Sequence, residues 1–191
     1  MQHTINFNHK PDYPLLNELF QHQDQLFERY SKLLMLRVDF AYRTDSDAFE
    51  NADADERSAH MNRLTEQCHA LKGLVGYAWV MEHAETHGFH IHAAFYINGQ
   101  EHRKIWEFWE QIKDQWGKIT EGQGYAHRCE PKPHYRVRGE WVVSFSDKQG
   151  RQGMQYILSY LAKQSQRTRY PIYQLSTVPA PSRRGRPRSQ S

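Results

Sequence analysis

Hydrophobic residues recur at helical spacing in four stretches of the chain, and each stretch predicts a helix with one buried face. The first begins beside Pro14, a residue suited to the first turn of a helix. Gly73 or Gly76 is suited to end the second. The predicted helices are 15–30, 61–71, 105–116 and 150–166, and the polar, acidic residues 44–56 predict a loop that leads into the second.

Aromatic and β-branched residues are concentrated in five other stretches, which predict strands. A short polar linker around Thr86 separates the second from the third, so these two are expected to form a hairpin. The predicted strands are 33–42, 76–83, 89–97, 125–129 and 135–145. The order helix, strand, helix, hairpin, helix, strands, helix predicts an α+β domain with a mainly antiparallel sheet and helices packed on it.

The length of 191 residues suffices for one domain with a substantial core. We divide the chain into an N-terminal helical segment, 1–32, a main domain, 33–170, and a tail, 176–191, whose Pro, Ser and Arg content predicts disorder. No apolar run approaches the roughly 20 residues of a membrane span, and the N-terminus lacks a secretory signal pattern. For that reason we expect no membrane partner. Two cysteines, Cys68 and Cys129, are too few for a disulfide framework, so we expect the protein in a reducing cytoplasm.

The net charge of +3 is unevenly distributed along the chain. Without the four arginines between 183 and 188, 21 basic residues face 22 acidic ones. Residues 128–169, however, carry nine Lys or Arg against three acidic residues. A basic second half and a basic tail favour a polyanionic partner such as DNA, and the alternative is a solvated charged surface.

His90 and His92 are the central chemical signal of the sequence. Because side chains alternate along a strand, the two imidazoles share one face and the apolar residues between and beside them share the other. Such a pair forms half of a metal site. In a hairpin centred near Thr86, Glu82 lies opposite His90 and is the expected third ligand. A one-residue slip of the register would bring His83 there instead, and the turn residue His87 is a weaker candidate.

Tyr156, Tyr160 and Lys163 form a second signal in the last predicted helix. At 100° per residue, the three side chains lie within about 60° of arc, away from the apolar stripe of that helix. A tyrosine is a poor nucleophile at neutral pH and needs a nearby cation to stabilise its phenolate. Lys163 and a bound metal would supply that charge, which favours phosphate chemistry over a purely structural role for the tyrosines.

Two motifs and their order resemble a known superfamily. His90-Ile91-His92 is similar to the HUH motif of single-strand endonucleases, and Tyr156, Tyr160 and Lys163 are similar to the two-tyrosine motif of rolling-circle replication initiators. The closest likeness is to the initiators of filamentous phages (inoviruses) and of their prophage relatives. That likeness spans roughly residues 33–165. It rests on three segments: Leu36–Phe40, Trp79–Glu82 and Tyr160–Lys163.

The resemblance implies an HUH/RRM-like (ferredoxin-like) core and a metal-dependent endonuclease in the cytoplasm of a bacterial host. It implies that Mg²⁺ or Mn²⁺, held by the two histidines and a third polar residue, polarises the scissile phosphate of a single-stranded or hairpin origin. By ligand type alone, Mn, Zn or Fe would be expected before Mg. Tyr160 is the expected nucleophile, which leaves a 5′-phosphotyrosine and a free 3′-OH, and Tyr156 is the partner for a second transfer. No helicase motif is present, so a host helicase and polymerase are expected partners.

The same resemblance leaves two other functions open. One is an HUH transposase that uses the same chemistry, although the short chain favours an initiator. The other is a catalytically silent DNA-binding regulator derived from this fold, against which the intact His90, His92, Tyr160 and Lys163 argue.

Further DNA contacts are expected outside the catalytic residues. Arg37 and Asp39 share a face of the first predicted strand and are placed to line the site, with a structural carboxylate as the alternative for Asp39. Basic and aromatic residues alternate between 125 and 141, a pattern suited to holding phosphates and stacking on unpaired bases. The tail resembles an AT-hook around Arg184 and Arg186, or is a nonspecific basic tail. The arginines expected to bind DNA in these two stretches are Arg128, Arg136, Arg138, Arg184 and Arg186.

Overall fold

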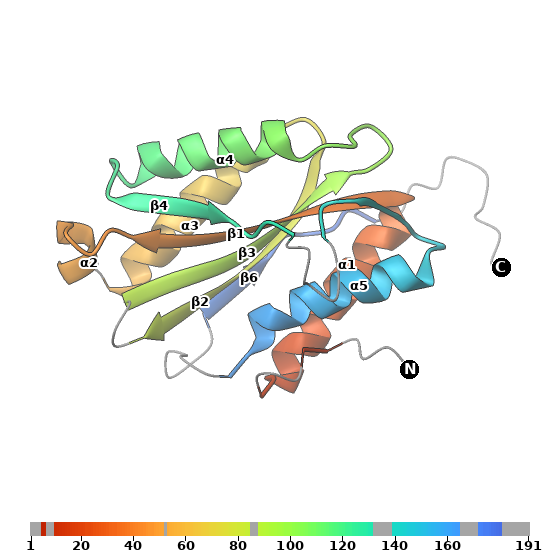
Figure 1. Cartoon of the computed structure of the whole chain (residues 1–191), viewed down its shortest axis with the longest axis horizontal. Helices are drawn as coiled ribbons and strands as arrows, with labels where there is room; N and C mark the ends of the chain where they lie inside the picture. Colours follow the sequence, from red (N-terminus) through yellow and green to blue (C-terminus); the bar gives the residue numbers. More distant parts are fainter. Residues whose placement is uncertain are drawn as a thin grey trace.

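A six-stranded antiparallel sheet forms the centre of the protein in a computed structural model, which describes residues 5–6, 10–51, 53–84, 88–131, 139–164 and 172–180. Helices pack on both faces of this sheet (Figure 1). In chain order the elements are α1 Tyr13–Arg29, β1 Lys32–Tyr42, α2 Asp47–Asn51, α3 Ala54–Cys68, β2 Leu74–Ala84, β3 Gly88–Asn98, α4 Trp106–Ile119, β4 Gly124–Arg128, β5 Val142–Ser144, α5 Lys148–Leu158, the 3₁₀ turn η1 Ser159–Ala162 and β6 Ile172–Leu175.

The strand order is β4-β1-β3-β2-β6, and every pairing is antiparallel. β1 is long enough to pair with β5 along its first residues and with β4 along its last ones. The predicted α+β class, with a mainly antiparallel sheet and helices packed on it, is therefore confirmed, and the arrangement is that of a ferredoxin-like fold.

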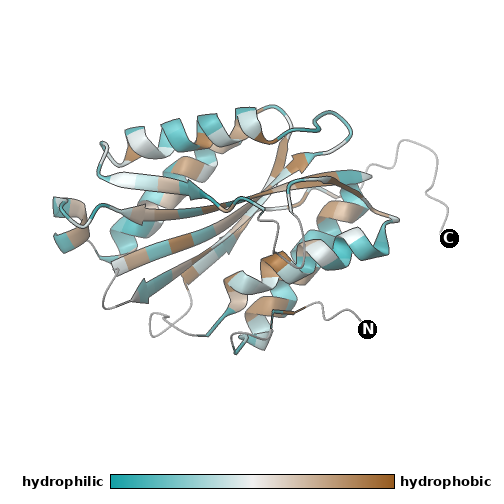
Figure 2. Cartoon of the chain, in the orientation of Figure 1, coloured by the Kyte–Doolittle hydropathy of each residue, from teal (hydrophilic) through white to brown (hydrophobic). Residues whose placement is uncertain are grey.

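Alternation along the strands divides the core into two layers. The side chains of Leu36, Val38 and Phe40 point to the layer that α3 and α4 cover. The side chains of Leu33 and Met35 point to the opposite layer, which α1, α5 and η1 cover. Figure 2 shows the matching pattern on the helices, whose brown apolar faces alternate with teal polar ones. In the part of the chain that the structure describes, no helix is long and apolar enough to cross a bilayer.

Capping residues explain where α1 and α5, which cover the same face of the sheet, begin. Asp12 caps α1 by accepting a hydrogen bond from the backbone N–H of Leu15, and Pro14 lies in the first turn as predicted. Asp147 caps α5 in the same way by accepting from the N–H of Gly150. Each cap stabilises its helix by about 1 kcal/mol and fixes where the buried face begins.

Two predicted boundaries in the first half are wrong. The predicted loop contains the short helix α2, and α3 ends at Cys68 rather than at a glycine. Gly73 instead lies in the turn before β2 with a φ of 99°, and a Cβ at this position would overlap the ring of His102. The glycine is therefore required by the turn, not by the end of the helix.

The second half departs further from the prediction. The last helix ends at Leu158 instead of Gln166, because η1 tightens the chain and Lys163 is extended and pairs with Pro11. β5 covers only 142–144 of the predicted 135–145, of which 135–138 lie outside the described residues. β6 was not predicted, since four residues carry too short an alternation to detect.

The segment that follows β6 packs against the body of the protein at Ser176. Ser176 is buried, and its oxygens bond to the ring of His22 and to the backbone N–H of Tyr77. Ser176 is the first residue of the predicted tail, of which 181–191 lie outside the described residues. Because α1 and β6 both pack with the sheet, one core includes residues on both sides of the expected boundaries at 32 and 170.

Candidate active site

The histidines of β3 and the carboxylate of β2 share one face of the sheet. Glu82 pairs with His90 in the β2–β3 ladder, which is the register expected from the sequence. Asp39 of β1 pairs with His92 from the other side. The alternative ligand His83 pairs with Phe89 and lies on the opposite face, so the one-residue slip is excluded. His87 lies outside the described residues.

The His92 imidazole is held between two carboxylates. Its Nδ1 lies 2.7 Å from Asp39 Oδ1, and its Nε2 lies 3.2 Å from Glu82 Oε2. Burial alone would lower the pKa of His92, but the hydrogen bonds to both carboxylates outweigh burial and raise it. Burial would likewise raise the pKa of Asp39, but His92 and Arg37 hold it well below its usual range.

Tyr160 and Lys163 complete this cluster from the end of α5. Lys163 Nζ donates to the Tyr160 hydroxyl at 3.0 Å and lies 2.9 Å from Glu82 Oε2. The Tyr160 ring packs edge-on against the His92 ring, with centroids 5.2 Å apart. Burial would lower the pKa of Lys163, but the bonds to Tyr160 and Glu82 raise it, so the residue is an ammonium.

Lys163 contacts Tyr160 as predicted, but the continuous helix that was expected to bring the two residues together is not present. The sequence places Tyr156, Tyr160 and Lys163 on one face of a continuous helix. In the structure Lys163 follows a 3₁₀ turn and has extended backbone angles. Its amine reaches Tyr160 because the chain bends back toward Pro11, a tertiary contact that helical spacing does not describe.

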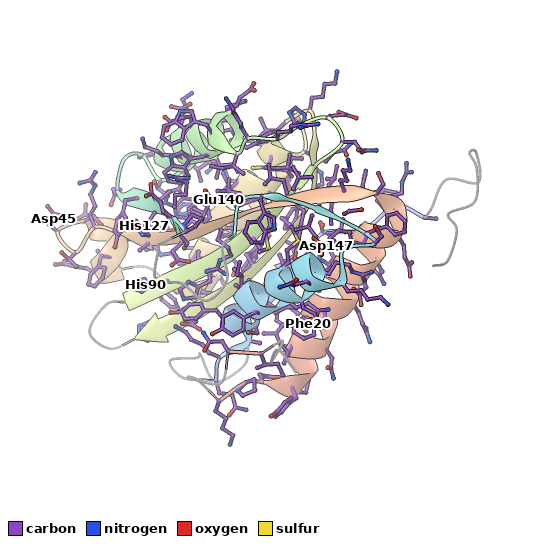
Figure 3. All side chains as sticks on the ribbon, turned by 45° about the vertical axis from the view of Figure 1, so that its right-hand side comes forward. Phe20, Asp45, His90, His127, Glu140 and Asp147 are labelled. Carbon is purple, nitrogen blue, oxygen red and sulfur yellow. The ribbon has the colours of Figure 1, made fainter. Side chains whose placement is uncertain are left out.

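A cavity of about 400 Å³ opens beside Tyr160, between the sheet face and α5. Figure 3 shows two residues of its wall, His127 on β4 and Glu140 before β5, on the side of the sheet where His90 is labelled. Both predicted tyrosines line this cavity together with both predicted residues of β1. The wall residues that matter below are Met35, Arg37, Asp39, Glu140, Tyr156 and Tyr160.

Arg37 is buried at the base of this cavity. Its Nη2 lies 3.1 Å from Asp39 Oδ1, and its guanidinium lies 5.8 Å from the centre of the Tyr160 ring. Burial would lower the pKa of Arg37, but Asp39, together with smaller contributions from Cys129 and Tyr160, outweighs burial and raises it. Asp39 therefore links the cavity to the histidine cluster, since one of its oxygens serves both Arg37 and His92.

The remaining predicted DNA contacts divide into two groups. Arg128 lies within the described residues, but its guanidinium is bonded to Glu140 at 2.8 Å and to Glu130 at 2.5 Å. It therefore holds two carboxylates rather than presenting an open positive charge. The other four predicted contacts, Arg136, Arg138, Arg184 and Arg186, lie outside the described residues.

Three residues near the site were not singled out from the sequence. His127 pairs with Asp39 in the β1–β4 ladder, and Cys129 follows at the end of β4, where its sulfur lies 4.0 Å from Arg37 Nη2. Burial raises the pKa of the Cys129 thiol to about 11, so it is uncharged near neutral pH. Glu140 lies on the cavity wall. If the pairing of β1 with β4 had been known, His127 and Cys129 would have been placed near Asp39, but no local sequence pattern indicates that pairing.

The donor set of the cluster suits a divalent cation. Imidazole and carboxylate groups from three adjacent strands face one another, and Glu82 Oε1 is buried with no hydrogen-bond partner among the described residues. Within those residues, no three His, Cys, Asp or Glu side chains are already arranged around an ion position. Both ring nitrogens of His92 contact carboxylates, so His92 would have to release one of them to become a ligand.

Comparison with known protein families, with curated proteins and with solved structures finds no match for this chain. The likeness to HUH initiators therefore rests on the motif residues, and the function has to be inferred from the site.

Proposed function

We propose that the protein is a metal-dependent endonuclease that nicks and rejoins single-stranded DNA through Tyr160, as a rolling-circle replication initiator does. The observation that carries the proposal is the environment of the Tyr160 hydroxyl. It accepts a hydrogen bond from Lys163, its ring packs on His92, and it borders a cavity that Arg37 also lines. An ammonium 3.0 Å from the hydroxyl stabilises a phenolate, the form of tyrosine that attacks phosphorus.

In the proposed reaction, Tyr160 Oη forms a bond to the scissile phosphorus and the bond from phosphorus to the 3′-oxygen breaks. The phenol proton leaves to solvent, and the departing 3′-oxygen takes up a proton to become a 3′-OH. The energy of the broken phosphodiester is kept in the 5′-phosphotyrosine, so the reverse attack by a 3′-OH rejoins the strand.

The other residues of the cluster position these groups. Lys163 is fixed by Glu82, and Asp39 orients the His92 ring against Tyr160. Arg37 adds positive charge beside the tyrosine ring. Mg²⁺ or Mn²⁺ held by His90, His92 and Glu82 would supply a Lewis acid for the scissile phosphate. Tyr156 lines the same cavity and would act in a second transfer.

The proposal is tested with a panel of labelled single-stranded and hairpin DNAs and Mn²⁺. The products are separated on a denaturing protein gel, where a covalent adduct migrates as a labelled band. We expect an adduct that EDTA abolishes, that Tyr160→Phe abolishes and that Tyr173→Phe leaves unchanged. Tyr173 is the matched control, since its hydroxyl bonds to Glu18 and it is not a residue of the cavity wall.

Two results would contradict the proposal. An adduct that persists in Tyr160→Phe would assign the attack to another residue. DNA binding without any adduct across the panel would indicate a DNA-binding protein with a silent site.

A further inference from the structure

Two residues on the wall of the cavity beside Tyr160 each carry a buried polar atom that the proposed reaction does not use. Arg37 Nη1 is a donor and Glu140 Oε1 is an acceptor, and neither finds a hydrogen-bond partner among the described residues. The Arg37 side chain is 7% exposed and that of Glu140 is 13% exposed, so bulk water does not readily satisfy either. A buried group without a partner costs roughly 1–3 kcal/mol, which a ligand that pairs with it would recover.

Glu140 is held in place at some cost to the fold. Its φ of 64° lies in the left-handed region, which is uncommon for a residue with a side chain. Arg128 fixes its other carboxylate oxygen at 2.8 Å, and burial raises the pKa of Glu140 despite that ion pair. Strained backbone is retained where the surrounding structure over-determines it, and it is concentrated at ligand-binding sites.

The charges of the cavity wall disfavour an anion as the occupant. Arg37 is accompanied on this wall by three carboxylates, those of Asp39, Glu130 and Glu140. Inside the cavity a phosphate would face these carboxylates, whereas a neutral group with both donors and acceptors would not be repelled. The scissile phosphate would instead lie at the Tyr160 hydroxyl, which the Lys163 ammonium contacts.

The remaining walls suit a flat heterocycle. Tyr156 and Tyr160 contribute aromatic rings, and Met35 and Ile157 contribute apolar surface. About 400 Å³ is ample for a purine base, and stacking of a base on an aromatic ring contributes roughly 1–3 kcal/mol. An apolar cavity with a few fixed polar atoms is the usual form of a small-ligand site.

We infer that this cavity binds one unpaired guanine of the DNA strand, next to the phosphate that Tyr160 attacks. Guanine offers the acceptors O6 and N7 to Arg37 and the donors N1–H and N2–H to Glu140. The inference rests on the proposed function for its substrate class, since it takes single-stranded DNA as the ligand. Beyond that function, it names the base that is bound, guanine, and the two residues that recognise it, Arg37 and Glu140.

The test measures binding in EDTA, so that no cleavage is needed for the readout. The probes are fluorescein-labelled nine-nucleotide oligothymidylates whose central position is T, G, A, C or inosine, and fluorescence anisotropy gives each Kd. We expect G to bind roughly 10-fold more tightly than T, A or C. Inosine, which lacks the N2 amine, is expected to lose several-fold of that gain.

Two matched variants locate the effect on the protein. Glu140→Met removes the unpartnered acceptor and keeps the length of the side chain. Asp24→Asn removes a carboxylate that pairs with another arginine, Arg151, and that is not a residue of the cavity wall, so it is the control. We expect Glu140→Met to reduce the preference for G to less than about two-fold and Asp24→Asn to keep it. Thermal unfolding of both variants verifies that they fold, and the inosine comparison needs the wild-type protein alone.

Equal affinity for all central bases, preference for a base other than guanine, or a preference that survives in Glu140→Met would overturn the inference. Its failure is distinguishable from that of the nicking proposal. A guanine preference without a covalent adduct would support the guanine site and contradict the nicking reaction. An adduct without a base preference would support the nicking reaction and contradict the guanine site.

Discussion

Replacing Lys163 with Met tests whether the cluster is held together by a buried ion pair. The Lys163 ammonium lies 2.9 Å from Glu82 Oε2, and the two side chains are 8% and 2% exposed. At an effective dielectric constant of about 20, two unit charges at that distance attract by roughly 6 kcal/mol before desolvation is subtracted. Removing one partner of a buried pair costs about 3–5 kcal/mol, because a charge is left buried without compensation.

We expect the cost of Lys163→Met to be about 3 kcal/mol, since His92 remains within 3.2 Å of the same carboxylate. In a chain of this size, that cost lowers Tm by roughly 6–12 °C. Urea unfolding followed by circular dichroism gives the free energy of unfolding. Lys113→Met is the control, because Lys113 is about half exposed and its pair with Glu110 spans 3.8 Å, for which less than about 1 kcal/mol is expected.

A double variant identifies the cause of the loss. In Glu82→Gln/Lys163→Met no uncompensated carboxylate remains, so this protein is expected to be more stable than Lys163→Met alone. A cost for Lys163→Met no larger than that for Lys113→Met would refute the reasoning, and so would a double variant less stable than the single one.

Two other predictions concern stability away from the site. Burial lowers the pKa of His22 to about 4, against an opposing hydrogen bond to Ser176, so only the unfolded chain takes up this proton as pH falls below 6.5. His22 should therefore remove about 2 kcal/mol of stability between pH 7 and pH 5 in urea titrations, and a His22→Gln variant that retains the full loss would contradict this. Gly73→Ala should destabilise by at least 1–2 kcal/mol in thermal unfolding, roughly the cost of a left-handed residue with a side chain, because a Cβ there would also meet the His102 ring. Gly117→Ala, in open space within α4, should stabilise by up to about 1 kcal/mol, and equal effects at 73 and 117 would refute the argument.

The hairpin of β2 and β3 was predictable because its signals are local. Both strands are close in sequence, both alternate clearly, and a short linker sets their register. The shared face of His90, His92 and Glu82 followed from that register. The presence of Arg37 and Asp39 on the neighbouring strand also followed from alternation, once β1 lay beside β3.

The parts that could not be predicted depend on contacts between distant segments. Nothing in the residues around His127 and Cys129 indicates that β4 pairs with β1, so their position beside Asp39 was missed. The apolar period of α5 continues to Leu161, but the tertiary pairing of Lys163 with Pro11 overrides it. Glu140 was counted as one charge in a basic region, and its burial arises from the ion pair with Arg128.

The central claim is that Tyr160, rather than Tyr156, forms the bond to DNA. The most direct test isolates the covalent adduct, digests it with trypsin and nuclease, and locates the nucleotide by tandem mass spectrometry in the peptide 152–163, which contains both tyrosines. The account predicts a nucleotide linked through its 5′-phosphate to Tyr160, the tyrosine whose hydroxyl Lys163 contacts. A nucleotide found on Tyr156 alone, or linked through a 3′-phosphate, would contradict it.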